Sequence, residues 1–205
     1  MKAIYLIPAA TAALLLVAGG AQAQSVNSGQ RNQANVRAQL NAVITNVNDD
    51  VTATSAAIGN SLTIEGHTAT GISNNQFFTG DAVSALNAAV KDVNGDVALT
   101  SAAIANSATI KTEAWGGHIS NVQNANYDPT ATLNATIGDI NGEVRATAAA
   151  ISNSATIDSR LSGLNSTQNN GAAVNAQVNA GIRDVNGTVQ ATAAAIGNSL
   201  TVTGF

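Results

Sequence analysis

Acidic and amide side chains recur in a phrase that resembles the start of a calcium-binding loop. Asp92, Asn94 and Asp96 follow the D-x-N-x-D order of the first ligands of an EF-hand. The rest of that loop is missing, because Val97 stands where it needs glycine and Ala103 where it needs glutamate. The corresponding stretches of the chain are residues 46–50, 139–143 and 184–188. Calcium at these turns is one reading, and the pattern favours the other, in which each carboxylate caps its own turn.

Histidine and serine offer little support for catalysis. His67 and His118 are the only histidines, the chain has no cysteine, and neither histidine lies near a cluster of carboxylates. A metal site is therefore not indicated. The repeated serines have no histidine at corresponding positions, so a catalytic triad lacks a base. We expect no catalytic residue, no metal, no cofactor and no enzymatic activity.

Four aromatic residues are the remaining candidates for a binding site. Phe77, Phe78, Trp115 and Tyr127 lie outside the most regular parts of the sequence. On a surface of small residues they form a candidate binding platform. The alternative, which the pattern favours, is that they fill or cap the fold at its loops.

The composition limits the kinds of partner. The chain has 8 basic and 12 acidic residues, a net charge of -4, and only 10% charged residues. Nucleic-acid binding requires clustered Lys and Arg, so we expect no nucleic-acid partner. The surface must consist mainly of Asn, Thr, Ser, Gln and Gly, which suits extracellular fibres and adhesins.

The N-terminus predicts export. Lys2 precedes a short apolar run over residues 9–19, and Ala21-Gln22-Ala23 forms a cleavage site of the small-x-small type. We predict a signal peptide over residues 1–23 and a mature chain from residue 24 to residue 205. Without cysteines, that chain is held together by packing and hydrogen bonds alone.

A long phrase occurs four times in the rest of the chain. It begins at Val51, Val97, Val144 and Val189, and its central asparagines lie 46, 47 and 45 residues apart. A fixed period of this size is typical of stacked repeats. We divide the chain into units of about 25–66, 67–115, 116–158 and 159–205.

The backbone of the repeats has two readings. The first reading is helical, coiled-coil-like repeats, because a set of apolar residues falls on heptad positions: Val83, Leu86, Val90, Val93, Val97 and Ile104. Strand periodicity is the other reading: residues 174–182 alternate apolar and polar, and the phase changes at Asn186-Gly187, a strong turn signal. Because Asn-Gly inside a helix costs about 1 kcal/mol or more, we predict an all-β solenoid.

A solenoid places equivalent residues in rows. Asn60, Asn106, Asn153 and Asn198 then form an amide ladder, with an aliphatic stack of Ile58, Ile104, Ile151 and Ile196 beside it. A repeat of about 46 residues makes either two coils or one larger coil. With two coils, exact equivalents lie two layers apart.

The repeated phrases also carry a resemblance to known proteins. The Ala-Ala-Ile-Gly-Asn-Ser phrase and the Val-Asn-Gly turns after a signal peptide resemble the holdfast attachment (Hfa-type) surface proteins of stalked alphaproteobacteria. The phrases at residues 30–35 and 121–126 are similar to curlin repeats. The resemblance implies an outer-surface protein that helps to anchor an adhesive polysaccharide and that self-assembles.

Three functional hypotheses follow. The first is an exported structural adhesin or anchor at the cell surface or outer membrane. Its partners are a surface polysaccharide, other envelope anchor proteins and further copies of itself, as a homo-oligomer or polymer. The second is the coiled-coil stalk of a trimeric adhesin. The third is an extracellular β-helix enzyme acting on polysaccharide, which needs clustered acids and bases that the scattered charges do not provide.

Overall fold

The protein is built of β-strands throughout the part that the structure describes. The structure is a computed structural model, and it describes residues 25–66, 71–113, 117–160 and 163–204, with the backbone of residues 5–6 and 9–17. Every regular element in these ranges is a strand. The predicted all-β solenoid is confirmed, and the helical alternative is wrong. The described residues include no helix that could cross a membrane.

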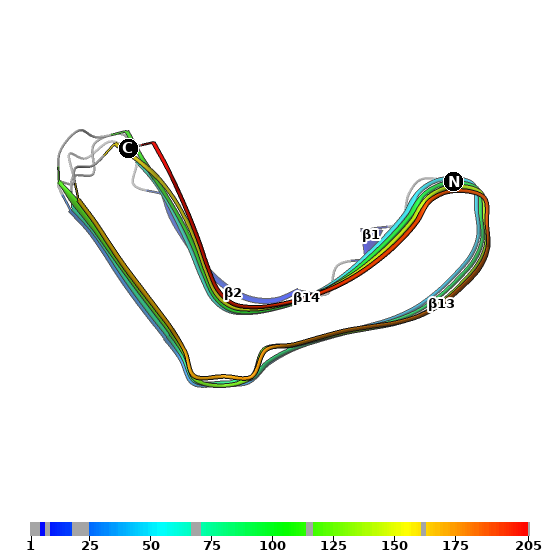
Figure 1. The fold of residues 1–205 in the computed structure, drawn as a ribbon, viewed down its shortest axis with the longest axis horizontal. Coiled ribbons are helices and arrows are strands. Elements are labelled where there is room, and N and C mark those ends of the chain that lie inside the picture. The colour runs from blue at the N-terminus through cyan, green and yellow to red at the C-terminus, as the bar shows by residue number, and fades with distance from the viewer. Residues whose placement is uncertain are drawn as a thin grey trace.

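Three parallel sheets run along the stack, and each repeat gives one strand to each sheet (Figure 1). The first sheet contains the short strands β3 (Ser25–Asn32), β6 (Gly71–Phe78), β9 (His118–Ala125) and β12 (Gly163–Asn170). The second contains β4 (Val36–Val47), β7 (Ala82–Val93), β10 (Thr130–Ile140) and β13 (Asn175–Val185). The third contains the long strands β5 (Val51–Gly66), β8 (Val97–Thr112), β11 (Val144–Ser159) and β14 (Val189–Thr203). We call β3–β5 coil 1, β6–β8 coil 2, β9–β11 coil 3 and β12–β14 coil 4.

Each repeat makes one coil. Asn60 pairs directly with Asn106, and Asn153 pairs with both Asn106 and Asn198. Equivalent residues are therefore neighbours in adjacent strands, about 4.8 Å apart along the stack. Of the two arrangements that the period allowed, the single larger coil is the one found.

The variation in repeat length falls between the coils. β5 ends at Gly66 and β6 begins at Gly71, β8 ends at Thr112 and β9 begins at His118, and β11 ends at Ser159 and β12 begins at Gly163. Within each coil the spacing from strand to strand is kept, so all three sheets share the same register steps. As a result, the rows of equivalent residues stay in register along the stack.

The long strands bend where their alternation breaks. Along β5, β8 and β11 inward and outward residues alternate until two consecutive residues are buried, for example Ala105 and Asn106 in β8. Two successive inward residues shift the pleat and change the strand direction, as a bulge does. Figure 1 shows the bend in the outline of these strands. It allows one strand to face the second sheet with its first half and the first sheet with its second half.

Two apolar clusters fill the coil on either side of this bend. The larger lies between the second sheet and the first halves of the long strands, and includes Leu86, Leu99, Leu133 and Ile137. The smaller lies between the first sheet and the second halves, and includes Ile72, Ile110, Ile119 and Ile157. Burial of these side chains is the main stabilising contribution, because the chain has no cysteine to form a disulfide and only 3% aromatic residues.

Tight turns join the second sheet to the third. One residue before each turn has a positive φ, between 53° and 57°: Asn46, Asp92, Asp139 and Asp184. Apart from glycine, Asn and Asp are the residues that adopt this conformation most readily. The predicted turn at Asn186-Gly187 is confirmed by the break between β13 and β14. Glycine is required because a Cβ at Gly142 would lie 2.3 Å from the carbonyl oxygen of Gly95 in the coil before it.

Two strands precede coil 1. β1 (Tyr5–Leu6) and β2 (Ala9–Val17) lie within the predicted signal peptide and pair in parallel with β5. The cleavage after Ala23 stays a prediction, and it would remove both strands from the edge of β5.

Candidate functional site

A row of glutamines runs through the interior, where sequence reasoning had not placed one. Gln76 donates from Nε2 to Oε1 of Gln30 (2.7 Å), Gln123 to Gln76 (2.8 Å), and Gln168 to Gln123 (2.8 Å). Each Nε2 also donates to a backbone carbonyl of the facing long strand at 2.7–2.9 Å, for example that of Ser154 for Gln123. The signal for this row was available, since the four glutamines recur at the same steps as the asparagines.

The predicted asparagines form a second row beside it. Asn60 donates from Nδ2 to Oδ1 of Asn106 (2.8 Å), Asn106 to Asn153 (2.8 Å), and Asn153 to Asn198 (2.9 Å). Asn106 and Asn153 also donate to backbone carbonyls of the first sheet at 2.9 and 2.8 Å. We call the two rows together the amide spine. The glutamines donate toward coil 1 and the asparagines donate toward coil 4.

The amide spine separates the two apolar clusters. Along β6, Ile72 belongs to the smaller cluster and Phe78 to the larger one, and the fully buried Gln76 lies between them. Buried amides are tolerated when their donors and acceptors are paired, and an unpaired one costs about 1–3 kcal/mol. The spine therefore fixes the register between coils, because a shift by one residue would leave these groups unpaired.

The predicted isoleucine stack lies outside the core. Ile58, Ile104 and Ile151 are half-buried, Ile196 is 37% exposed, and all four pair in register. They point to the opposite face of their strands from the buried Ala57 and Ala103, as strand alternation requires. The stack is thus an apolar stripe on the outer face of the third sheet.

A shallow groove of about 550 Å³ crosses the outer face of the second sheet. Its lining contains a third amide row, in which Asn87 donates to Asn41 (2.8 Å), Asn134 to Asn87 (2.9 Å) and Asn179 to Asn134 (2.9 Å). Small side chains complete the lining: Ala42, Val43, Ala88, Ala89, Ala135 and Thr136. We call this the amide groove. Its lining residues are all uncharged, so it fits a neutral, hydroxyl-rich ligand better than an ionic one.

The four aromatic candidates are not brought together. Phe78 is fully buried and packs where a Cβ on Gly59 would lie 2.5 Å from its ring, so it fills the interior and cannot be part of an exposed platform. Phe77 is half-buried under the guanidinium of Arg31, 5.5 Å from the ring centroid. Tyr127 is 52% exposed in the connection after β9, and Trp115 lies outside the described residues.

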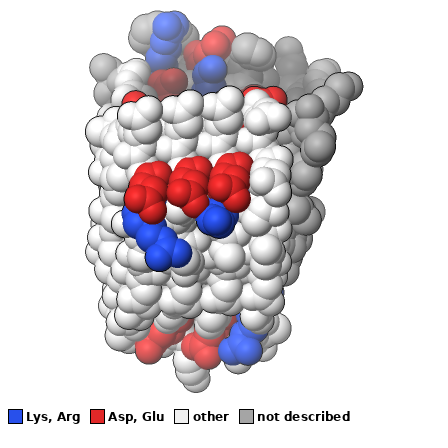
Figure 2. Space-filling view, turned by 90° about the vertical axis from the view of Figure 1, so that its right-hand side faces the viewer, with Lys and Arg blue, Asp and Glu red and all other residues white. Residues whose placement is uncertain are grey.

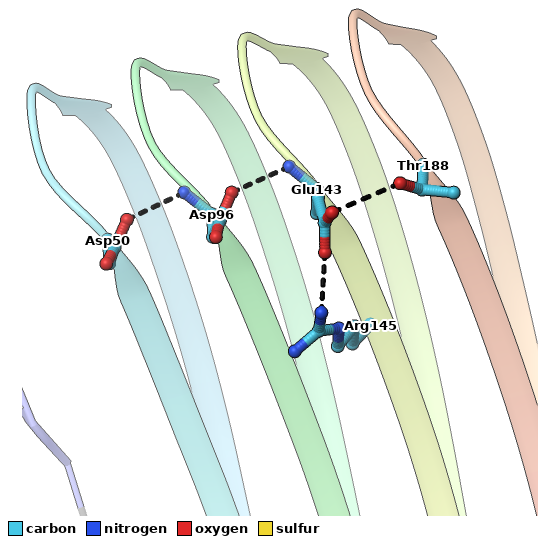
Figure 3. A network of polar contacts seen from close by, with 5 residues as sticks. All are labelled: Asp50, Asp96, Glu143, Arg145 and Thr188. Atoms are coloured by element: carbon cyan, nitrogen blue, oxygen red, sulfur yellow. Dashed lines mark hydrogen bonds and ion pairs between the residues drawn. The ribbon is translucent and has the colours of Figure 1, made fainter.

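Carboxylates at the turns bind backbone groups of the next coil (Figure 3). The Asp50 carboxylate accepts from the backbone N–H of Asp96 (2.8 Å), and that of Asp96 accepts from the N–H of Glu143 (2.8 Å). The side chain of Glu143 in turn accepts from Thr188 and Arg145. The expected caps within one turn are therefore mainly links between turns. The described residues contain no group of three or more His, Cys, Asp or Glu side chains that could hold a calcium ion.

The side of the solenoid that carries these turns also carries a row of charged side chains (Figure 2). Lys91 lies 3.8 Å from Asp92 and 3.5 Å from Asp139, and all three side chains are about half exposed. Exposed ion pairs of this kind contribute little to stability. Of the two histidines, His118 is exposed at the start of β9, and His67 lies outside the described residues.

Coil 4 is open on one side. Among the strands that the structure describes, β12, β13 and β14 each pair with a single neighbour, which leaves one row of their backbone donors and acceptors without a strand partner there. Apolar side chains of β14 are exposed beside this edge, with exposed fractions from 37% to 46%: Val189, Ile196, Leu200 and Val202. An edge of this length is a template for pairing with another chain.

Comparison with known protein families gives a match that covers most of the chain. A family model for holdfast attachment protein D matches residues 6–163 and again residues 74–205, which together cover almost the whole chain. The chain belongs to the holdfast attachment protein D family. The two matches overlap, as expected for repeats that resemble one another. No curated protein and no solved structure matches the chain. Family membership confirms the resemblance to holdfast attachment proteins, and it supports a role in attachment.

Proposed function

We propose that this chain is an exported cell-surface anchor that helps to attach an adhesive polysaccharide to the cell envelope. Membership in the holdfast attachment protein D family supports the attachment role. The amide groove is the observation that supports the polysaccharide, because it offers neutral donors and acceptors at a regular spacing across all four coils.

The groove would act by repetition. Each asparagine amide carries two N–H groups and two acceptor lone pairs, and the ladder uses one N–H and one lone pair of each inner asparagine. The remaining capacity can bind sugar hydroxyls, while Ala and Val side chains contact the sugar faces. One such contact is weak, and several contacts on one polymer chain reinforce each other because the later ones are intramolecular. Under this proposal the chain retains its ligand without chemical conversion.

Self-assembly is the second part of the proposal. The open edge of coil 4 supports it, because a second copy could continue the three sheets there. Cross-linking of the exported protein tests this part: a series of increasing sizes is expected, and a single monomeric species would contradict it. A discrete trimer would revive the stalk hypothesis only in its assembly state, since the helical backbone is excluded.

Retention of the polysaccharide by cells tests the anchor. Ala89 and Thr136 both line the groove and are exposed, so Ala89→Arg and Thr136→Arg each place a large side chain in it. Thr147→Arg places the same side chain on the outer face of the third sheet as a control. Cells that carry the groove variants should shed polysaccharide and lose surface attachment, as should cells that lack the gene, while the control should behave like wild type. Normal retention by groove variants that reach the surface in normal amounts would refute the assignment.

A further inference from the structure

The first turn of the solenoid differs from the later ones in a way that bears on assembly. In coils 2 and 3 the backbone N–H after the turn glycine, that of Asp96 or Glu143, is bound by a carboxylate of the coil before it. The equivalent N–H in coil 1 belongs to Asp50. Here the acceptor is the carboxylate of the adjacent Asp49, at 2.8 Å. Asp49 thus supplies from its own turn the acceptor that the preceding coil supplies in coils 2 and 3.

Asp49 also occupies the position that is glycine in every later coil. A Cβ added at Gly95, Gly142 or Gly187 would lie 2.6, 2.3 or 2.2 Å from a backbone atom of the preceding coil. These distances are shorter than real Cβ contacts, and the neighbouring atoms are backbone. The Cβ of Asp49 therefore points into the space that a preceding coil would fill.

The corner between the first and second sheets does not show this difference. Gly80 of coil 2 approaches coil 1 so closely that a Cβ there would lie 2.1 Å from the carbonyl oxygen of Ala34. Coil 1 carries Ala34 in the corresponding connection between β3 and β4. Coils 3 and 4 carry Tyr127 and Ala172 at the same position, so this corner accommodates a side chain inside the stack, and only the corner at Asp49 distinguishes coil 1 from all later coils.

Between the corners, the two end coils are complementary. Gln30 in β3 would meet the amide oxygen of Gln168 in β12, and Asn198 in β14 would donate to Asn60 in β5, each in the direction that the rows follow inside the chain. Val189 would meet Val51 in the register of the third sheet. The strands match, and the corner at Asp49 does not.

We infer that Asp49 is an end cap that limits head-to-tail stacking, in which coil 1 of one copy would extend coil 4 of another. The inference rests on the proposed self-assembly and gives it a regulating residue. The cap works through its Cβ, which stops the turn of the second copy from closing onto Gly187. Stacking then proceeds with a distorted first turn, and it is weaker than the contact between coils inside one chain.

Cysteine cross-linking of the exported protein tests this inference. The chain has no cysteine, so a variant with both Thr52→Cys and Gln190→Cys has these two as its only cysteines. They occupy one row of outward positions on the third sheet, in coils 1 and 4, and lie too far apart to join within a copy. In a stacked pair they come from neighbouring strands and can form a disulfide. The dimer and polymer bands on a non-reducing gel then report stacking in register.

Two substitutions separate the Cβ from the charge. Asp49→Gly removes both, and Asp49→Ala removes only the carboxylate. With the cost of overpacking as a guide, Asp49→Gly should raise the association constant about 5- to 150-fold, and Asp49→Ala should stay close to wild type. Gly95→Asp places the same side chain inside the stack and should lower folding stability.

The outcomes separate this inference from the proposed function. Equal cross-linking of wild type and Asp49→Gly would overturn the end cap while leaving self-assembly in place. An equal gain for Asp49→Ala would also overturn it, because the charge would then be the cause. No cross-linked species in any variant would remove both the cap and head-to-tail assembly, while polysaccharide retention would still be judged by its own assay.

Discussion

Replacement of Gln123 by methionine tests the role of the amide spine. Gln123 is fully buried. Its Nε2 donates to Oε1 of Gln76 (2.8 Å) and to the carbonyl of Ser154 (2.9 Å), and its Oε1 accepts from Gln168 (2.8 Å). Methionine has nearly the same length and volume, so the change removes the hydrogen bonds without opening a large cavity.

The magnitude follows from the groups left behind. The amide oxygen of Gln76 and the carbonyl of Ser154 lose a donor in the interior, at about 1–3 kcal/mol each. The Gln168 amide is half-buried in the last coil and can be hydrated, so its loss adds little. Gln123→Met should therefore lower the free energy of unfolding by about 2–6 kcal/mol, out of the roughly 5–15 kcal/mol of an ordinary domain.

Asn134→Ala is the matched control. Asn134 also makes two ladder bonds, to Asn87 and from Asn179, but its side chain is exposed and water can replace both partners. A change of about 0.5 kcal/mol or less is expected. Urea unfolding followed by far-ultraviolet circular dichroism measures both variants, with an unchanged m-value as the sign that the same surface unfolds. The reasoning is refuted if Gln123→Met costs no more than Asn134→Ala.

Further predictions concern the turns, the repeats and export. Gly142→Ala should destabilise the fold by about 1–3 kcal/mol through contact with the Gly95 carbonyl, whereas Gly181→Ala, with no atom within 4 Å of its Cβ, should be neutral or stabilising in thermal unfolding. Deletion of residues 118–162 removes coil 3 and its connection and should leave a folded three-coil protein whose m-value is about a quarter lower; an unfolded product would contradict independent stacking of coils. Mass spectrometry of the exported protein should find Gln24 as the first residue, and an intact residue 1 would refute the predicted cleavage.

Much of the fold could be predicted from the repeated phrase. Strand alternation and the Asn-Gly turns identified the strands because both are local properties of the chain. The competing heptad has a structural explanation. Leu86, Val90, Val93 and Val97 are buried, but a turn lies between Val93 and Val97, so inward residues of two strands imitated helical spacing.

Other features depend on contacts between coils, which spacing along one strand does not reveal. One coil per repeat requires the bend near Asn106, and only the stacked structure shows it. Phe78 is buried because Gly59 leaves room for its ring, a complementarity between neighbouring coils. The glutamine row is hard to predict because the residues around Gln76, Gln123 and Gln168 vary from coil to coil, whereas the phrase that contains the asparagines repeats almost unchanged.

The rows, the amide groove and the end cap all require equivalent residues to lie one strand spacing apart. Spin labels on Val43→Cys and Gly181→Cys measure this directly, because the two positions occupy one row in coils 1 and 4. Val43 is 82% exposed, and no atom lies within 4 Å of a Cβ added at Gly181. Three strand spacings predict a Cα separation of about 14 Å, and electron paramagnetic resonance should show the strong dipolar broadening of labels at that range. A separation of about 29 Å, as for two coils per repeat, would contradict the account.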